Sequence, residues 1–462
     1  MSRFSVSTLA FVFVQIGWAA PAYAGAFATA RYTGEHGHPL TENATSIYWN
    51  PGAMTRGPRG TRGLLDVNIA FRRVTYFHQV APTDDVPANA PEANVGRAEL
   101  FNVFGAPTLG LILKPSEDFA IGGLIHGPFG GMLQFSQNEK FENNPNYAGP
   151  VDGPQRWHAI TGALASVYFS AGAAYRFAPE LSVGVALNLI RSSVETLIAR
   201  NANGTNDVAT EGRASLNVSG WQWSFAAGVM SEVVKDQLWL GASYQAQPNV
   251  SGGMVLEGKQ RTSLISGEPP EEIDANLHQT YPDIIRLGMA YRPEPMVELR
   301  LFGAYERWSV TTDQCVTAAG ANCVLDDKGA TIPDTGSNVV LNAKRDWNDT
   351  FGVRGGFSYW TKPDRSLEIF GGLGYDSNAV PDATLEVSVP DSDRLAASAG
   401  LRFALGKTTH LAGSYTHLQY VGRDNTGKSE LAELGGQSKF PDAGGVYNSW
   451  IGIVNANIEV GF

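Results

Sequence analysis

The chain has 462 residues, a net charge of −11, 17% charged and 10% aromatic residues, and a mean hydropathy of −0.14. The acidic balance and the lack of a basic block argue against nucleic-acid binding, and the aromatic content argues against intrinsic disorder. Beyond the N-terminus no apolar run reaches the ~20 residues that a transmembrane helix needs. The 52 glycines instead indicate many β-strands.

Residues 1–24 have the form of a secretory signal peptide. Arg3 is the only charge before a mostly apolar stretch, residues 4–20, and a small-x-small cleavage site follows at residues 22–24. A single membrane anchor is the alternative, but the stretch is short and the cleavage site follows it at once. We therefore expect an exported protein whose mature chain begins at Gly25.

Residues 25–60 are rich in glycine and proline and show no long alternation of apolar and polar side chains. From residue 64 on, a strict period-two alternation begins and returns along the rest of the chain. These alternating segments run for about 12–18 residues, whereas strands of soluble proteins average ~5–6. We count fourteen of them: 64–78, 100–114, 118–135, 159–177, 181–197, 215–232, 237–257, 281–293, 296–310, 347–362, 365–377, 392–406, 409–421 and 447–462.

The connections between these segments alternate between short and long. The short ones are 114–117, 178–180, 293–295, 362–364 and 406–407, and the long ones are 79–99, 136–158, 198–214, 258–280, 311–346, 378–391 and 422–446. A soluble sandwich also alternates, but strand length and loop asymmetry favour a transmembrane barrel with short periplasmic turns and long extracellular loops. We expect an all-β fold: an antiparallel transmembrane β-barrel of fourteen strands over residues 61–462, ending on the outward-facing Phe462.

A cylinder of fourteen strands is too wide for its own wall side chains to fill. We therefore interpret residues 25–60 as an N-terminal plug, or hatch, inside the lumen. Phe27, Ile47, Tyr48 and Trp49 either line a ligand pocket or pin the plug to the wall. The turn formed by Asn50, Pro51 and Gly52 is expected to fix the plug's shape.

The third segment is interrupted at Gly127, Pro128, Phe129, Gly130 and Gly131. Proline has no N–H for the ladder, and the glycines allow backbone angles that a regular strand excludes. This run predicts either an ordinary bulge that relieves barrel curvature or a kink that opens a gap between strands.

Four inward-facing arginines are candidates for holding a ligand's carboxylate: Arg286, Arg300, Arg354 and Arg402. The alternative, which we favour, is that they pair with lumen acids such as Glu298, Glu368 and Glu459. Cys315 and Cys323 lie in the long connection 311–346, and in an oxidising compartment we expect a disulfide that stiffens this loop.

No motif in the sequence indicates an enzyme, a metal site or a cofactor. His36 and His38 lack a third ligand nearby, no phosphate-binding loop is present, and no Ser/His/Asp set is recognisable. We expect neither a bound metal nor nucleotide hydrolysis.

Three motifs resemble those of the FadL/TodX family of outer-membrane channels for hydrophobic compounds. Residues 42–54 resemble the family's Asn-Pro-Ala-Gly-Met stretch, with Ala and Gly exchanged here. Residues 375–383 and 389–394 resemble its Ser-Pro-Val-Pro loop and the strand start that closes it, although Asn378 replaces the usual proline. Residues 281–283 resemble a Leu-Pro that precedes a strand. The resemblance covers essentially the whole mature chain.

The resemblance implies a monomeric, plugged channel that passes long-chain fatty acids or aromatic hydrocarbons across the bacterial outer membrane by passive uptake. It also implies a lateral exit at a kink in strand three and an apolar groove at the extracellular rim, with Leu133, Phe135 and Phe141 as candidates. The implied partners are a hydrophobic substrate, outer-membrane lipid and, through Phe462, the barrel-assembly machinery. A loop-mediated adhesin or receptor, or a structural barrel without transport, is the alternative function; a lipid-modifying enzyme lacks a recognisable catalytic cluster.

Overall fold

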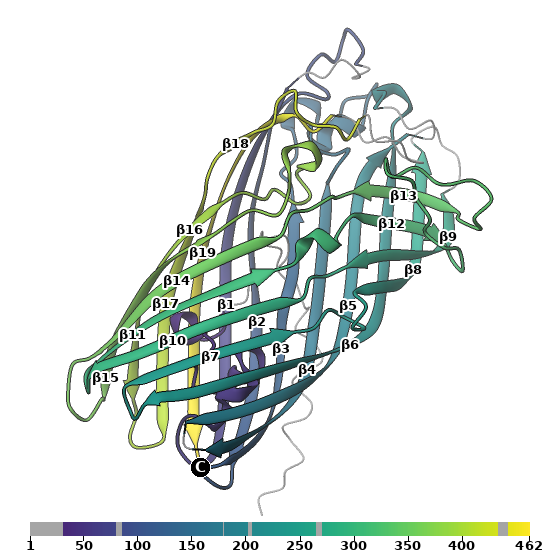
Figure 1. Ribbon diagram of the computed structural model, residues 1–462. Helices are drawn as coiled ribbons and strands as arrows, with labels where there is room; N and C mark the ends of the chain where they lie inside the picture. Colours follow the sequence, from purple (N-terminus) through teal and green to yellow (C-terminus); the bar gives the residue numbers. More distant parts are fainter. Residues whose placement is uncertain (1–30, 80–85, 179, 202–205, 265–269, 433–441) are drawn as a thin grey trace, which may run out of the picture.

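The computed structural model describes residues 31–79, 86–178, 180–201, 206–264, 270–432 and 442–462 (Figure 1). It is a closed antiparallel β-barrel in which β1 (Gly60–His78) pairs with β19 (Gly445–Gly461) along the whole length of both strands. The other long strands are β2 (Gly96–Lys114), β3 (Phe119–Gln134), β4 (Thr161–Ala178), β5 (Leu181–Arg200), β6 (Gly212–Val234), β15 (Leu367–Asp376), β16 (Arg394–Ala404) and β17 (Thr409–Tyr420).

Each of four further wall strands consists of two consecutive pieces, and each piece is hydrogen-bonded to a neighbouring strand. These pieces are β7 (Leu238–Gln245) with β8 (Gly253–Leu264), β9 (Glu271–Thr280) with β10 (Ile284–Glu294), β11 (Val297–Glu306) with β12 (Asp313–Ala318), and β13 (Val339–Lys344) with β14 (Thr350–Trp360). With β18 (Arg423–Asp424) a short addition beside β19, the wall has fourteen strands, as the alternation predicts.

The outer face of the wall is apolar. Leu187, Leu287 and Leu373 are 64%, 61% and 72% exposed, a degree of exposure that an aqueous surface would not favour for leucine but that a lipid-facing position explains. The pairing of β1 with β19 closes the sheet, so the wall has no edge strand at which the sheet ends, as a sheet surrounded by lipid requires. No helix among the described residues is long and apolar enough to cross a membrane.

The two ends of the barrel differ. Short turns and the C-terminus lie at one end, at the bottom of Figure 1, and longer connections gather at the other. The expectation that 258–280 and 311–346 are irregular loops is wrong in part, because β8 pairs with β9, and β12 pairs with both β9 and β13. These hairpins extend the wall beyond the lipid, where outward side chains such as Lys259 and Glu272 are charged and the apolar alternation is lost.

The described part of the N-terminal segment, residues 31–59, packs against the inner face of the wall (Figure 1). It contains η2 (Gly34–His36), α1 (Ser46–Trp49) and η3 (Pro51–Thr55). The tip at Asn50 fits against wall glycines: a Cβ on Gly228 would lie 1.9 Å from Asn50 Oδ1, and one on Gly184 would lie 2.4 Å from the Pro51 carbonyl carbon. Glycine on the inner face therefore makes room for this segment.

A loop between β15 and β16 covers the inside of the barrel at the end with the long connections. Ala379, Leu385 and Val387 in this loop are fully buried. The carboxylate of Asp391 accepts the backbone N–H groups of Ala379 and Val380, which closes the loop on itself. The loop packs onto a large apolar cluster that includes residues of β3, β4 and β5.

Candidate functional site

The ladder between β2 and β3 is short. It extends only from Leu113 paired with Ile121 to Leu109 paired with Ile125, although both strands continue for many residues beyond. The strands meet again further on, where the Asn102 Oδ1 atom accepts the Gln134 N–H at 3.2 Å and the Glu99 carbonyl accepts the Ser136 N–H at 2.9 Å. The wall therefore has a gap in its backbone pairing between these two points.

The position of the gap follows from strand geometry. The remaining ladder has five residue pairs. At ~3.3 Å per residue, the gap therefore begins roughly 16 Å along the strand from the turn. That distance lies inside the ~25 Å apolar band of an outer-membrane barrel. The gap therefore opens at the depth of the lipid.

The predicted interruption of strand three lies at this gap. On the side facing β4, His126 pairs with Tyr168 and Phe129 pairs with Ser166, so that Gly127 and Pro128 together oppose a single residue. This bulge changes which side chains face inward, because even-numbered residues are buried before it and Phe129 is buried after it. Gly130 and Gly131 continue the ladder to β4 beyond the bulge.

The residue before the bulge contacts the N-terminal segment. The His126 ring lies with its Nδ1 atom 3.1 Å from the Tyr32 hydroxyl oxygen and its Nε2 atom 3.1 Å from the Ser170 hydroxyl oxygen. The rings of Tyr32 and Tyr48 also pack edge-on against His126, with centroids 5.3 and 5.1 Å away. The segment 31–59 and the kinked strand thus share one aromatic contact.

A cavity of about 140 Å³ lies on the far side of the kink, toward the long connections. We call it the apolar cavity. Its walls are mainly aliphatic, and Gly131 of the kink borders it. The aliphatic lining residues are Leu133, Ala159, Ala163, Leu164, Val194, Ile198, Leu216, Leu277, Val316, Leu341, Ala343 and Val389.

One end of the apolar cavity carries a buried polar group of three side chains. Glu386 lies with its Oε1 atom 2.5 Å from Arg345 Nη1 and its Oε2 atom 3.0 Å from His158 Nδ1. All three residues are at most 5% exposed. Burial alone would raise the pKa of Glu386, but the charge of Arg345 and the hydrogen bond from His158 outweigh it and hold the pKa at about 2.

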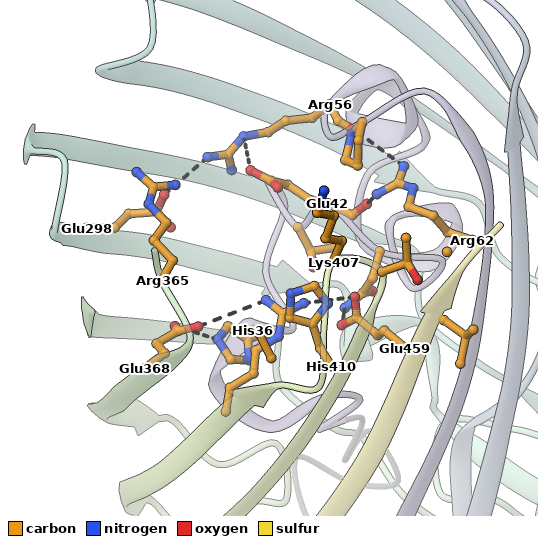
Figure 2. A pocket seen from close by; sticks show the side chains of 18 of the residues that line it. His36, Glu42, Arg56, Arg62, Glu298, Arg365, Glu368, Lys407, His410 and Glu459 are labelled. Atoms are coloured by element: carbon orange, nitrogen blue, oxygen red, sulfur yellow. Dashed lines mark hydrogen bonds and ion pairs between the residues drawn. The ribbon is translucent and has the colours of Figure 1, made fainter. Parts of the chain in front are cut away.

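A second cavity, of about 360 Å³, opens at the end of the barrel with the short turns (Figure 2). We call it the polar cavity. Residues between 36 and 59 form one side of it and wall strands form the other. An ion pair joins Arg56 Nη2 to Glu298 Oε2 at 3.2 Å, and a hydrogen bond joins His36 Nε2 to Glu368 Oε1 at 2.8 Å. Arginine and lysine side chains outnumber carboxylates in its lining, so it suits water and ions rather than a hydrocarbon.

The predicted plug residues are brought together against the wall, apart from Phe27, which lies outside the described residues. Ile47 packs in the same buried cluster as wall residues such as Leu124, while Tyr48 and Trp49 border a small cavity of about 40 Å³. The side chain of Asn50 donates to the carbonyl oxygens of Pro39 and Val229, both at 2.9 Å, and accepts the Gly52 N–H. The turn thus fixes both the segment's own shape and its seat on β6.

The four candidate arginines all contact protein groups. Arg354 pairs with Asp376 at 3.0 Å, Arg402 with Glu459 at 3.0 Å, and Arg300 with Glu298 at 3.6 Å. Arg286 has no carboxylate partner among the described contacts; its guanidinium lies 4.3 Å from the Tyr48 ring centroid and donates to Gln245. These contacts favour the alternative in which the arginines bind the protein itself.

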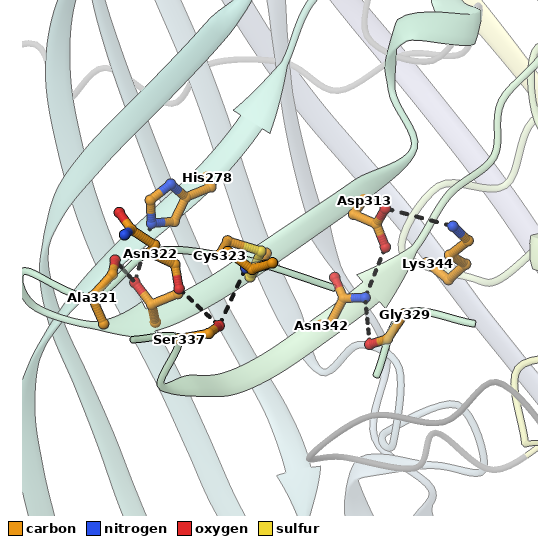
Figure 3. Close-up of a disulfide and its surroundings, with 12 residues drawn as sticks. His278, Asp313, Ala321, Asn322, Cys323, Gly329, Ser337, Asn342 and Lys344 are labelled. Carbon is orange, nitrogen blue, oxygen red and sulfur yellow. Dashed lines mark hydrogen bonds and ion pairs between the residues drawn. A yellow bond between two sulfur atoms is a disulfide. The ribbon is translucent and has the colours of Figure 1, made fainter. Parts of the chain in front are cut away.

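The three rim candidates are not gathered in one groove. Leu133 lines the apolar cavity, and Phe135 packs in the same large cluster. Phe141 lies in a separate cluster with Ala90, Ala93 and Val208. A disulfide joins Cys315 to Cys323 beside His278 (Figure 3).

Three features of the site have no counterpart in the sequence interpretation. The polar end of the apolar cavity is assembled from residues 158, 345 and 386, which no local pattern connects. His126 is a single histidine in an apolar strand. Pro107 of β2 lies in the stretch beyond Leu109 that is not paired with β3. Because proline has no N–H for the ladder, this second proline is a sequence signal for the gap.

The chain matches the family model described as outer membrane protein transport protein (OMPP1/FadL/TodX) over residues 17–442. It is 23% identical over 348 residues to the long-chain fatty acid transport protein of Escherichia coli O6:H1, covering 68% of this chain and 70% of that one. Among solved structures it is similar to a Pseudomonas aeruginosa FadL homologue, with a TM-score of 0.73, 16% identity and coverage of 96% and 98%. The P. putida toluene transporter TodX is also similar, with a TM-score of 0.60, 15% identity and coverage of 91% and 94%.

These matches confirm the resemblance and the barrel, the outer-membrane location and a transport role for a hydrophobic compound rather than an enzymatic one. The family model extends over nearly the whole chain. The chain therefore belongs to the OMPP1/FadL/TodX family of outer-membrane transport proteins.

Proposed function

We propose that this protein takes up hydrophobic molecules passively, holds them in the apolar cavity, and releases them sideways through the gap between β2 and β3. The single observation that carries this proposal is the short β2–β3 ladder, which ends at Leu109 and Ile125 within the lipid-facing part of the wall. An alkyl chain gains ~0.8 kcal/mol for each CH₂ that leaves water. A dry route that ends in lipid is therefore downhill without an energy source.

The two cavities support a lateral route over a straight one. The apolar cavity borders the kink at Gly131, whereas the path toward the periplasm leads through the polar cavity and its ion pairs. A hydrocarbon in the polar cavity would have to displace water from charged groups, which is unfavourable. Exit through the wall avoids that step.

We propose that residues 25–60 are the plug and that it controls the gap through His126. Tyr32 and Tyr48 of this segment contact the residue directly before the bulge. A shift of the plug would remove these contacts and free the kinked strand. We also propose that residues 1–24 are cleaved in export, and that the monomeric barrel is assembled with Phe462 as the signal for the assembly machinery.

The test replaces the kink by residues that favour a regular strand. In the variant Gly127→Val, Pro128→Thr and Gly130→Val we expect uptake of a labelled hydrophobic compound into liposomes to fall at least tenfold while the barrel still assembles. The control is Gly123→Val in the paired part of the same strand, where a Cβ meets nothing closer than 3.7 Å. Undiminished uptake by the kink variant would refute the lateral exit.

A further inference from the structure

The polar end of the apolar cavity contains a carboxylate that the protein itself supplies. Glu386 comes from the loop between β15 and β16, Arg345 from the segment after β13, and His158 from the connection before β4. All three line the apolar cavity and are nearly fully buried. A charged group in such a place requires a partner, and Arg345 and Glu386 are each other's partner.

Several hydrogen-bond donors at this end already point to protein groups. Arg345 donates from Nη1 to Glu386 and from Nε to the Gln314 side-chain oxygen at 2.8 Å. His158 and Ser388 also donate to the Glu386 carboxylate. An incoming carboxylate would compete with Glu386 for these donors and would lie beside its negative charge, among residues that are at most 5% exposed. Like charges repel in such a buried place.

An uncharged ligand meets no such obstacle. The rest of the wall is aliphatic, so apolar surface buried there is stabilised by about 25 cal/mol per Å². The volume, about 140 Å³, is close to that of an apolar cavity of about 150 Å³ that accepts benzene. The cavity therefore matches a compound of the size of a single ring or a short alkyl group.

We infer that Glu386 is a specificity-determining residue of the apolar cavity, and that its carboxylate restricts the cavity to uncharged hydrophobic compounds. This inference rests on the proposed function. It assigns the preference for uncharged over anionic compounds to one residue, and not to the overall charge of the loops at the extracellular end. The other carboxylate at the border, Glu195, is exposed and hydrogen-bonded to Asn217 at 3.4 Å, so it does not face the buried donors.

The experiment compares two probes of similar shape, toluene and benzoate, by equilibrium binding of the radiolabelled compounds to the full mature chain in nanodiscs. The wild-type protein should bind toluene at least tenfold more tightly than benzoate. In Glu386→Gln, Arg345 loses its charged partner and becomes available, so benzoate affinity should rise at least tenfold while toluene affinity changes less than twofold. Glu386→Ala leaves space beside Arg345 and should give the same gain.

Two controls isolate the effect. Glu142→Gln removes the same charge from an exposed loop on the same side of the barrel and should leave the ratio of the two affinities unchanged. In the double variant Arg345→Met, Glu386→Gln the gain in benzoate affinity should disappear, because the released cation is absent.

The outcomes separate the two proposals. Unchanged benzoate affinity in both Glu386 variants, with toluene binding intact, overturns the role of Glu386. Equal wild-type affinity for the two probes overturns it as well, and leaves the channel function standing. Binding of neither probe by the wild-type protein overturns the proposed function and, with it, the assignment of Glu386.

Discussion

The polar cavity and the apolar cavity of this barrel differ in volume and in the chemistry of their linings. The polar cavity is the larger, at about 360 Å³ against 140 Å³, and charged side chains line it. The apolar cavity is lined mainly by aliphatic side chains, and no residue of 31–59 among the described residues contributes to it. Size alone would favour the polar cavity as the site of transport, whereas the chemistry of the linings favours the apolar one.

In the proposed function, the segment 31–59 seals the polar cavity and leaves the apolar cavity accessible. It shares ion pairs with the wall at the polar cavity and an aromatic contact with the kink next to the apolar cavity. A single segment thus contacts both the wall at the polar cavity and the strand at which the proposed lateral path begins. The variants described below change the N-terminal segment, the apolar cavity or a loop outside both.

The largest effect is expected when the seal is removed. Deletion of residues 25–59, with residues 1–24 kept, should turn the polar cavity into an open aqueous pore, because a wall of this width encloses more space than its own side chains fill. Single-channel recording in planar bilayers should show a steady conductance that the intact protein lacks. A deletion variant that assembles and conducts no better than the intact protein would contradict a sealing role for this segment.

The next effect concerns the apolar cavity. Ala159→Phe places a phenyl ring, about the size of the benzene that a cavity of this volume accepts, on a buried residue of its lining. We expect uptake of a hydrophobic compound to fall about tenfold in the liposome assay, with assembly unchanged. Ala159→Ser is the control at the same position, and normal uptake by the phenylalanine variant would place the substrate elsewhere.

The sequence predicts the strands of the barrel wall better than the side-chain contacts inside the barrel. The outward alternation and the kink at residues 127–131 are local patterns, since a period of two and a proline flanked by glycines are visible within one strand. The side-chain contacts inside the barrel join residues that are distant in sequence. Glu386 and His158 are 228 positions apart, and Glu386 and Arg345 are 41 apart, so only closure of the barrel brings them together.

A related limit explains why the sequence does not predict the hairpins of β8 with β9 and of β12 with β13. Their outward side chains face water and not lipid, which removes the apolar alternation that identifies the other strands. The four inward arginines show a related ambiguity: the pattern places them in the lumen, but only the folded wall supplies Asp376, Glu459 and Glu298 as partners.

A smaller effect is expected at the seat of the N-terminal segment. Gly228→Ala would put a Cβ 1.9 Å from Asn50 Oδ1, and overpacking of this kind costs about 1–3 kcal/mol. We expect a partial loss of the seal, seen as intermittent conductance. Gly123→Ala is the matched control because its Cβ meets nothing closer than 3.7 Å; equal behaviour of the two variants would argue against a tight seat.

The smallest effect on transport is expected at the disulfide. Replacement of Cys315 and Cys323 by alanine opens a loop of eight-residue separation, and chain entropy predicts a loss of about 2–3 kcal/mol in stability. Neither cysteine lines the apolar cavity, so uptake should stay within twofold of the intact protein. Thermal unfolding measures the stability change, and a tenfold loss of uptake would show that the loop has a direct part in transport.

The most direct test of the lateral route is to locate the substrate on its way out. A neutral hydrophobic probe that carries a diazirine is allowed to enter the protein in liposomes, is photolysed, and its attachment sites are mapped by peptide mass spectrometry. The account predicts attachment to residues around the kink, such as Phe129, and to the lining of the apolar cavity. Attachment to the lining of the polar cavity, for example at Arg56 or Arg62, would contradict it.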